Sequence, residues 1–526
     1  MLNVSRLIFV LILVHYNLSL DTNKDKDELR LLYDKDYYSS SVVELVKLLQ
    51  LEQEFMENFT IYTNVLQEKV DSLNIYLDAL KRPSHRTHNE REKFVSDPLN
   101  AFGLIRRLNQ DWPKLQNYTQ KPVGLVELDA MQNILTKAPE PFDMNESLKS
   151  MHRIETTYGL QPKDMAKGLL HNKQYNYKLS IRDCLALAHH NFEFGDIHRS
   201  FLWFQVYMKN NSSQDIIILE LKAFATSIAT RSLNLLNKSL SNETVHKLVS
   251  RQFREAKPID LENFISLKLK QWDSFYGTES PETSPTSHQI GCRGGFPKKN
   301  NLICRYNSTT NAFLKLAPIK VEEISRDPYI VLFHEVLTDR EIEEMKGEIK
   351  EMYNGLSDWE DPKEIVSRIY WITEDSPFRD RINQRIADMT GFKLDEFPAL
   401  QLANFGVGGY FKPHYDYFEE RLRLVDANNT LGDRIASLIF YAGEVLQGGQ
   451  TVFPDVKVAV EPIKGNALFW FNDFDDSSPD PRTLHSVCPV IVGSRWTITK
   501  WIHYEPQIFV KPCSPRLLPK APLISV

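Results

Sequence analysis

A histidine and an aspartate separated by one residue stand in the stretch GVGGYFKPHYDYF, where His414 and Asp416 flank Tyr415. In a β-strand, residues i and i+2 point to the same face, so both side chains could bind one ion. A third ligand is needed, and His485 in RTLHSVCPV, 69 residues after Asp416, is a candidate. Two histidines and a carboxylate form the ligand set of non-haem Fe(II) oxygenases. Zinc is the alternative, although no His-Glu-x-x-His motif is present.

A cation and a hydroxyl accompany these residues. Arg495 lies ten residues after His485 in RWTITKWIHY, and Thr451 lies in GGQTVFP. An arginine inside a β-structure could anchor a carboxylate through two parallel hydrogen bonds. A single histidine on a strand is more often an ordinary core or surface residue. The four features together, in a β-rich segment, favour a metal site that binds an anionic co-substrate.

Short β-type runs surround the candidate site. After about residue 330 the chain contains ALQLANF, IASLIFYAG, NALFWFN and RWTITKWIHY, separated by Gly, Pro, Asn and Asp turns. Many short strands of this kind predict a β-sandwich or jelly roll. The preceding stretch YGTESPETSPTSHQI, residues 276–290, is rich in Pro, Ser and Thr and predicts a linker.

The first half of the chain has helical patterns. Residues 42–82 carry apolar side chains at spacings of three and four with no Pro or Gly, which predicts one long amphipathic helix. Either a bundle helix or a dimerisation coiled coil fits this pattern. The stretch SIRDCLALAHHNFEFGDIHRSFLWFQVYMKN predicts a helical hairpin of the tetratricopeptide type, turning at Gly195-Asp196. Such hairpins form grooves for extended peptides, and Phe192, Phe194 and Trp203 are the candidate peptide contacts.

Length and composition set the outer limits. The 526 residues predict about three or four domains, and a net charge of −6 provides no basic surface for nucleic acid. The N-terminus has Arg6 followed by the apolar run Leu7–Val14, which is typical of a secretory signal peptide. No later apolar run is long enough to span a membrane.

Two further features fit an oxidising compartment. Potential glycan acceptors occur in Asn-x-Ser/Thr triplets at Asn58, Asn117, Asn145, Asn210, Asn211, Asn237, Asn242, Asn307 and Asn428. The chain has five cysteines. Cys292 and Cys304 flank a short polar loop and Cys488 and Cys513 bracket the last strand, which predicts the disulfides Cys292–Cys304 and Cys488–Cys513. Cys184, in a helical pattern, is then the buried unpaired thiol.

The motifs resemble the α subunit of collagen prolyl 4-hydroxylase along nearly the whole chain. The resemblance includes PLNAFGLIRRLNQDWPKL, DCLALAHHNFEFGDIHRSFLWFQ, QLANFGVGGYFKPHYDYF, GDRIASLIFYAGEVLQGGQTVFPDV and TLHSVCPVIVGSRWTITKWIH. It implies a double-stranded β-helix in which His414, Asp416 and His485 bind Fe(II). The implied cofactors are Fe(II), 2-oxoglutarate, O₂ and L-ascorbate. The implied partner is protein disulfide isomerase in an α2β2 tetramer, which would explain residence in the endoplasmic reticulum lumen although the C-terminal LISV is not a retention signal.

The sequence departs from the family pattern at three places. Arg495 stands where the family usually has the lysine that binds the 5-carboxylate of 2-oxoglutarate, and Thr451 could add a hydroxyl there. Phe405 stands where tyrosine is common. The peptide-binding block diverges from the family pattern after its first hairpin, where LELKAFATSIATRSLNLLN lacks the expected tyrosine-rich pattern.

These observations predict a chain with an all-α N-terminal half and a C-terminal β catalytic domain. The predicted parts are a signal peptide (1–20), a helical dimerisation region (21–170), a tetratricopeptide-like peptide-binding domain (171–275), a linker with a local disulfide (276–330) and a dioxygenase domain (331–526). The predicted reaction is 4-hydroxylation of peptidyl proline in procollagen-like X-Pro-Gly sequences, with conversion of 2-oxoglutarate to succinate and CO₂. The alternatives are a non-catalytic subunit that binds proline-rich chains, and an oxygenase that acts on another secreted protein.

Overall fold

The computed structural model describes residues 38–80, 87–196, 199–200, 202–204, 206, 284–297, 299–349, 353–354, 367–394, 397–418 and 431–510. The predicted signal peptide, most of the predicted peptide-binding domain, Cys513 and the triplets at Asn210, Asn211, Asn237, Asn242 and Asn428 lie outside these residues. The chain divides into two compact units, residues 45–140 and the remainder. Within the described part of the chain, no helix has the length and apolar character needed to cross a membrane.

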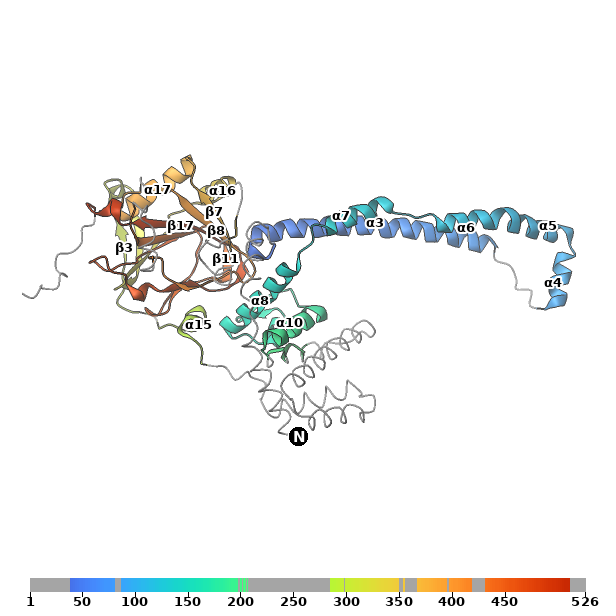
Figure 1. Cartoon of the computed structure of the whole chain (residues 1–526), viewed down its shortest axis with the longest axis horizontal. Helices are drawn as coiled ribbons and strands as arrows, with labels where there is room; N and C mark the ends of the chain where they lie inside the picture. The colour runs from blue at the N-terminus through green and yellow to red at the C-terminus, as the bar shows by residue number, and fades with distance from the viewer. Residues whose placement is uncertain are drawn as a thin grey trace, which may run out of the picture. The chain divides into compact units, whose positions relative to one another are not determined.

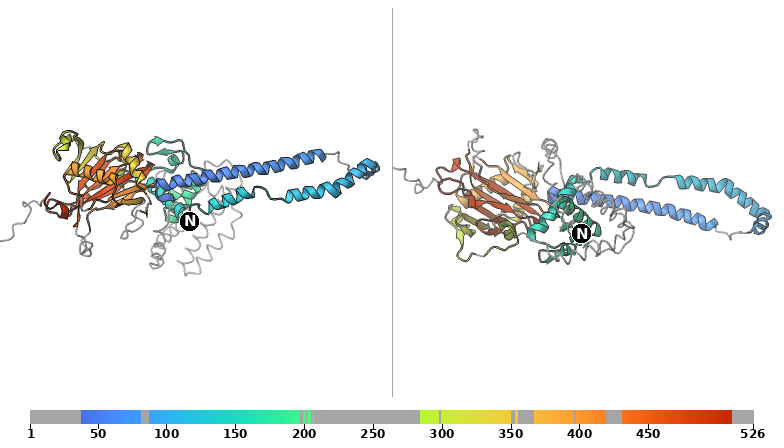
Figure 2. Two further views of the ribbon diagram at one scale, coloured as in Figure 1. Left: turned by 90° about the horizontal axis from the view of Figure 1, so that it is seen from above. Right: turned by 60° about the horizontal axis from the view of Figure 1, so that its bottom comes forward.

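Residues 45–140 form a helical unit around one long helix. Its elements are α3 (Val42–Leu80), which starts just before the unit, α4 (His88–Val95), α5 (Pro98–Arg106), the π-helical turn η2 (Arg107–Asp111), α6 (Trp112–Gln120) and α7 (Leu125–Leu135). The return helices lie beside α3 (Figures 1 and 2), and Lys69 Nζ donates to the carbonyls of Thr119 and Lys121. The long helix is thus present as predicted, while its role in a coiled coil or dimer stays a prediction.

A second helical segment belongs to the larger unit. It contains η1 (Tyr38–Ser40), α8 (Pro141–Tyr158), α9 (Pro162–Met165), the hairpin β1 (Leu169–Leu170) and β2 (Lys173–Gln174), and α10 (Ile181–Phe194). A capping box between Ser180 and Asp183 starts α10, and Gly195, which has a left-handed backbone, ends it. The turn predicted at Gly195-Asp196 is therefore present, but the tetratricopeptide arrangement as a whole stays a prediction.

Strands dominate from residue 304 onward. They are β3 (Cys304–Asn307), β4 (Ile319–Arg326), β5 (Tyr329–His334), β6 (Tyr353–Asn354), β7 (Arg368–Ile372), β8 (Leu400–Phe405), β9 (Phe411–His414), β10 (Arg434–Tyr441), β11 (Val445–Gly448), β12 (Thr451–Phe453), β13 (Val458–Val460), β14 (Ala467–Phe471), β15 (His485–Val487), β16 (Val490–Gly493) and β17 (Arg495–His503). The helices among them are α15 (Ser287–Cys292), α16 (Asp339–Gly347) and α17 (Pro377–Thr390), with the short turns η3 (Phe313–Lys315), η4 (Pro481–Thr483) and η5 (Glu505–Gln507). A helical N-terminal half and a β-rich C-terminal region are confirmed.

Two sheets face each other and hold the candidate site between them. The large sheet has the order β3-β4-β5-β14-β10-β17-β8-β7-β6, and the small sheet has the order β13-β12-β15-β9. Along β10, residues alternate: Ile439 and Tyr441 face the small sheet, while Leu438 and Phe440 join the core beneath α16 and α17. Figure 1 shows these two helices over one face of the large sheet. The inner faces of both sheets therefore line the site.

A third apolar core joins the helical segment to the back of the small sheet. Ile154 and Tyr158 of α8 and Leu187 of α10 pack in one cluster with Val452 of β12 and Cys488, which follows β15. Tyr158 donates its hydroxyl hydrogen to the carbonyl of Pro489 over 2.7 Å. This packing supports the two small-sheet strands that carry Thr451 and His485.

Candidate metal centre and co-substrate pocket

The structure brings the three predicted metal ligands together on neighbouring strands. His414 ends β9 and His485 begins β15, and the two residues are direct partners in the antiparallel ladder. Asp416 follows two residues after His414. Its Oδ1 lies 3.6 Å from Nε2 of each histidine. Among the described residues, this is one of two groups of metal-type ligands whose candidate ligand atoms lie within 4.8 Å of one another.

Backbone carbonyls fix the orientation of both imidazoles. His414 Nδ1 lies 2.7 Å from the carbonyl oxygen of Lys412, and His485 Nδ1 lies 3.0 Å from that of Thr483. A carbonyl oxygen can only accept, so each Nδ1 carries the proton and each Nε2 keeps a lone pair for a metal. Phe411 stacks on His414 with ring centroids 3.6 Å apart and restricts its rotation further. The donor arrangement therefore fits a metal ion.

A hydrogen bond from a serine side chain orients Asp416. The Ser437 hydroxyl on β10 donates to Asp416 Oδ2 over 2.6 Å and leaves Oδ1 for the ion. Asn472 Nδ2 in turn donates to Ser437 Oγ over 3.0 Å. Second-layer hydrogen bonds of this kind commonly set metal affinity.

The protonation states also suit a metal. Burial, together with the neighbouring His485, lowers the pKa of His414 to about 3, so this imidazole is neutral at pH 7. Burial alone would raise the pKa of Asp416, but the two imidazoles and the Ser437 hydrogen bond outweigh it and lower that pKa. A neutral His414 beside an ionised Asp416 fits the ligand set of a 2-His-1-carboxylate Fe(II) site.

Arg495 begins β17 and is the predicted anchor for a carboxylate. Its side chain is almost completely buried, with 1% of its surface exposed. Its Nε donates to the carbonyl of Gly449 over 3.0 Å, and Nη2 lies 3.4 Å from the hydroxyl of Thr451. Its guanidinium lies 4.7 Å from the Phe405 ring centroid, within cation–π distance. Thr451 and Arg495 are therefore brought together as predicted.

No carboxylate among the described residues forms an ion pair with Arg495. Burial lowers its pKa to about 10, so it remains charged at pH 7. A buried cation without a counter-charge is costly for a fold. The pocket is thus suited to an anionic ligand, such as the far carboxylate of a 2-oxo dicarboxylic acid.

Two residues of the site were missed from the sequence. Tyr441 lies beside Arg495, and its hydroxyl is 2.8 Å from Thr451 Oγ. Ser437 orients Asp416. Both belong to the run IASLIFY, where Ser437, Ile439 and Tyr441 alternate on one face. The two-residue periodicity could have identified them once the inner face was known.

An aromatic cluster next to the metal ligands was also missed. The rings of Trp371 on β7 and Trp501 on β17 have centroids 5.8 Å apart. The guanidinium of Arg434 lies 4.1 Å from the Trp501 ring and 4.8 Å from that of Phe418. Aromatic surfaces of this kind are typical binding sites for proline-rich segments.

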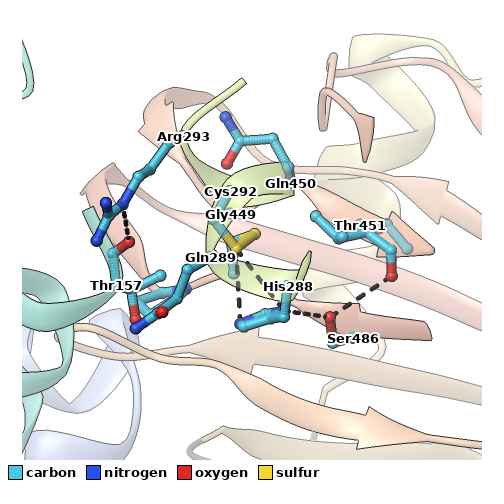
Figure 3. The surroundings of a disulfide bond; sticks show 12 residues. Thr157, His288, Gln289, Cys292, Arg293, Gly449, Gln450, Thr451 and Ser486 are labelled. Atoms are coloured by element: carbon cyan, nitrogen blue, oxygen red, sulfur yellow. Dashed lines mark hydrogen bonds between the residues drawn. A yellow bond between two sulfur atoms is a disulfide. The ribbon is translucent and has the colours of Figure 1, made fainter. Parts of the chain in front are cut away.

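The predicted disulfides are wrong. Cys292 at the end of α15 bonds to Cys488, so neither Cys292–Cys304 nor Cys488–Cys513 is formed. The spacing of the cysteines in the sequence favoured disulfides that close short loops. In the structure, α15 packs on the back of the small sheet and places Cys292 against the residue that follows β15 (Figure 3). Cys304 is free and exposed, and Cys184 is buried and unpaired as predicted.

The disulfide lies beside a histidine and close to β15. His288 of α15 has Nδ1 at 2.8 Å from Ser486 Oγ and Nε2 at 3.6 Å from Cys292 Sγ. Arg293, which follows the same helix, donates to the carbonyl of Thr157 on α8 (Figure 3). His288, Cys292 and Cys488 form the second metal-type group, but the disulfide occupies both sulfur atoms. The α15 segment is thus a bridge between α8 and the strand of His485.

One of the three predicted peptide contacts is wrong. Trp203 is fully buried, and its Nε1 donates to the buried Glu155 carboxylate over 2.9 Å. An aromatic stripe at helical spacing here forms core rather than groove. Phe194 has 51% of its surface exposed and Phe192 is half-buried, so both remain candidates.

Comparisons with known proteins agree with the site. Residues 41–172 match the model of the prolyl 4-hydroxylase α-subunit N-terminal region, and residues 400–503 match the 2OG-Fe(II) oxygenase superfamily. Prolyl 4-hydroxylase subunit alpha-1 of Homo sapiens is 28% identical over 521 residues, which cover 91% of this chain and 95% of the relative. The chain is a relative of the prolyl 4-hydroxylase α subunits. The resemblance inferred from its motifs is confirmed.

Two further relatives and one solved structure also match the chain. Subunit alpha-2 of Gallus gallus is 27% identical over 516 residues, with 90% of this chain and 95% of the relative covered. Subunit alpha-2 of Caenorhabditis elegans is 29% identical over 494 residues, with 86% and 90% covered. A viral collagen prolyl hydroxylase from Paramecium bursaria Chlorella virus-1 matches at 22% identity and a TM-score of 0.26, over 33% of this chain and 95% of that structure. The superfamily uses Fe(II), 2-oxoglutarate and O₂.

Proposed function

We propose that the protein is a prolyl 4-hydroxylase of the Fe(II)/2-oxoglutarate type. It would add a hydroxyl group to C4 of peptidyl proline while 2-oxoglutarate is converted to succinate and CO₂. One oxygen atom of O₂ enters the hydroxyl group and the other enters succinate. This proposal rests mainly on the His-Asp-His cluster, whose ligand atoms lie close together, and on the buried Arg495, which has no counter-charge among the described residues.

Each residue has a defined part in this proposal. His414, Asp416 and His485 would hold Fe(II), which supplies the activation of O₂ when bound. Arg495 and Thr451 would bind the far carboxylate of 2-oxoglutarate and orient it. The buried walls formed by the inner faces of the two sheets exclude water from the reacting groups.

Proline recognition would use two surfaces. The Trp371–Trp501 pair and Arg434 lie next to Asp416, since Arg434 Nη1 is 3.5 Å from the Asp416 carbonyl oxygen. An extended polyproline segment could lie on these rings and present one residue to the metal. Phe192 and Phe194 would contribute to peptide binding in the tetratricopeptide-like segment.

The cellular setting is part of the same proposal. The leader-like N-terminus and the Asn-x-Ser/Thr triplets support a glycoprotein of the endoplasmic reticulum lumen. Of the described triplets, Asn307 is a poor acceptor, because it is buried and its side-chain nitrogen donates to the Met389 carbonyl. The partner would be protein disulfide isomerase in an α2β2 tetramer, and L-ascorbate would keep the iron reduced.

A turnover assay tests the proposal. The chain, co-expressed with protein disulfide isomerase, is given Fe(II), ascorbate, 2-oxoglutarate and a Pro-Pro-Gly repeat peptide, and succinate and 4-hydroxyproline are measured. Peptide-dependent release of both products is expected. His485→Ala should abolish it while assembly is retained, and His334→Ala, which removes the partner of Glu322 instead, should not.

Two other results of this assay would favour one of the alternative functions. Intact iron binding without turnover would favour a non-catalytic subunit that binds proline-rich chains. Succinate release that does not depend on the collagen-like peptide would favour an oxygenase for another secreted protein. The departures at Phe405 and Arg495 are the features that keep both alternatives open.

A further inference from the structure

Three side chains form a row across the inner face of the large sheet at the level of the metal ligands. In the ladders of β14, β10 and β17, Trp470 pairs with Ser437 and Ser437 pairs with Trp501. Directly opposite residues in antiparallel strands share a face, so the three side chains stand side by side. Ser437, in the middle, already holds Asp416. The two tryptophans therefore flank the residue that orients a metal ligand.

The indole nitrogen of Trp470 contributes no hydrogen bond to the described fold. None of its surface is exposed, and its Nε1 has no hydrogen-bond partner among the described residues. Tryptophan usually places its N–H on a partner when it is buried. Unpaired buried donors are rare because they lose their bond to water without replacement. Such a donor next to a ligand site indicates a partner that binds there.

The position of Trp470 identifies the site that it borders. Its ring packs edge-on against the metal ligand His485, with centroids 4.7 Å apart, and against Phe453 at 5.4 Å. Two residues further along, the buried Asn472 Oδ1 has no hydrogen-bond partner in the described part of the chain, while Asn472 Nδ2 donates to Ser437. Unpaired polar atoms thus gather around the metal ligands on this wall.

The two tryptophans differ in what can reach them. The Trp501 Nε1 is also buried and has no partner among the described residues, but the Trp501 ring is partly exposed and contacts the half-buried Trp371, so a peptide can reach it. Trp470 is sealed between the sheets, where a macromolecule cannot reach it. A co-substrate of the size of 2-oxoglutarate is small enough, and the proposed function places one of its ends at the metal ligands, where the His485 ring packs on Trp470. The co-substrate's carboxylate and oxo oxygens at the metal end are acceptors only and match an N–H donor.

We propose that the Trp470 indole N–H donates a hydrogen bond to an oxygen atom at the metal end of 2-oxoglutarate. This inference rests on the proposed function. It assigns Trp470 as a co-substrate-binding residue at the opposite end of the ligand from Arg495. The 2-oxo acid is then held at both ends, by a cation at its far carboxylate and by a neutral donor near the metal.

The test is a binding measurement on the full-length chain in its assembled form. Mn(II) replaces iron so that no turnover occurs, and 2-oxoglutarate affinity is measured by titration calorimetry beside Mn(II) affinity. Trp470→Phe keeps an aromatic ring and removes the N–H. Trp496→Phe is the matched control, because Trp496 is a buried tryptophan on β17 that faces the opposite core.

A hydrogen bond to a charged group leads us to expect that Trp470→Phe weakens 2-oxoglutarate binding about 10- to 100-fold. Its Mn(II) affinity should stay within about threefold of wild type, and Trp496→Phe should match wild type in both. If Trp470→Phe disturbs folding, benzothienylalanine at position 470 replaces the N–H by sulfur at nearly constant shape. The benzothienylalanine variant should show the same loss of 2-oxoglutarate affinity.

Three results would overturn the inference. Unchanged 2-oxoglutarate affinity in Trp470→Phe or the benzothienyl variant would show that the N–H has another partner. Equal losses of Mn(II) and 2-oxoglutarate affinity would show that the ring acts only through His485. Wild-type protein that binds Mn(II) but no 2-oxoglutarate would refute the proposed function itself, and this inference with it.

Discussion

Replacing Arg495 by methionine should change stability and co-substrate binding in opposite directions. The substitution removes a buried charge that has no carboxylate partner among the described residues and leaves an apolar side chain of similar length. Burial lowers the pKa of Arg495 from 12.5 to about 10. At about 1.4 kcal/mol per unit, this shift corresponds to a cost of about 3 kcal/mol for keeping the charge in the ligand-free fold.

Part of the stability gained by removing the buried charge is lost again, because one hydrogen bond is broken. The Gly449 carbonyl loses the donor that lies 3.0 Å away, and an unpaired buried carbonyl costs about 1–3 kcal/mol. The net expectation is a ligand-free protein that is more stable by about 1 kcal/mol, which corresponds to about 1 °C in melting temperature for a unit of this size. Loss of two charge-assisted hydrogen bonds should weaken 2-oxoglutarate binding by at least about 100-fold.

Thermal unfolding with Mn(II), with and without 2-oxoglutarate, measures both effects. Wild type should melt higher when 2-oxoglutarate is present, whereas Arg495→Met should start higher and show no shift. Arg379→Met is the control, because Arg379 is a buried arginine that Asp375 and Asp380 neutralise, and it should not gain stability. A lower melting temperature for ligand-free Arg495→Met would refute the charge argument. A retained 2-oxoglutarate shift would remove Arg495 from the pocket.

Three shorter predictions concern the surroundings of the site. Ser437→Ala frees Asp416 Oδ2 and should lower Mn(II) affinity about 10-fold, as measured by competition with a chelator; unchanged affinity would contradict the orienting role. Burial lowers the pKa of His288 to about 4, so the unfolded chain binds more protons below pH 6.5. Stability should fall by about 2 kcal/mol between pH 7 and pH 5, and His288→Gln should flatten this slope in thermal unfolding. Alkylation and peptide mapping of the native chain should label Cys304 and find Cys292 cross-linked to Cys488; a Cys292–Cys304 peptide would contradict the structure.

The metal ligands could be predicted because their geometry is local. Strand alternation predicted that His414 and Asp416 lie together. Although β9 ends at His414, Asp416 follows it closely enough for its Oδ1 to lie 3.6 Å from His414 Nε2. The motif around His485 is specific enough to resemble a known family. The hydrogen bonds that orient these ligands could not be predicted from alternation, because their partners lie on other elements. Ser437 reaches Asp416 from β10, and Asn472, which directly follows β14, donates to Ser437. Only the ladder between β10 and β14 shows that these residues meet.

The wrong predictions share a physical cause. Cysteine spacing measures loop closure along the chain, whereas the packing of α15 on the small sheet decides that Cys292 meets Cys488. Similarly, Phe194 and Trp203 are both aromatic residues of the predicted helical hairpin, on either side of its turn, yet Trp203 is core and Phe194 is exposed. Periodicity gives the face of a helix, but it does not say what covers that face.

The core shared by the helical segment and the small sheet has a consequence for where the chain can be cut. Sequence composition suggests a break at the linker, with an independent oxygenase that starts near residue 331. A fragment starting there would lack α8, α10 and α15 and would expose Val452 and Cys488 to water. The strands beneath these residues carry Thr451 and His485, so the metal site would lose its backing. The smallest autonomous oxygenase is therefore longer than the catalytic motif and includes the helices that precede the linker.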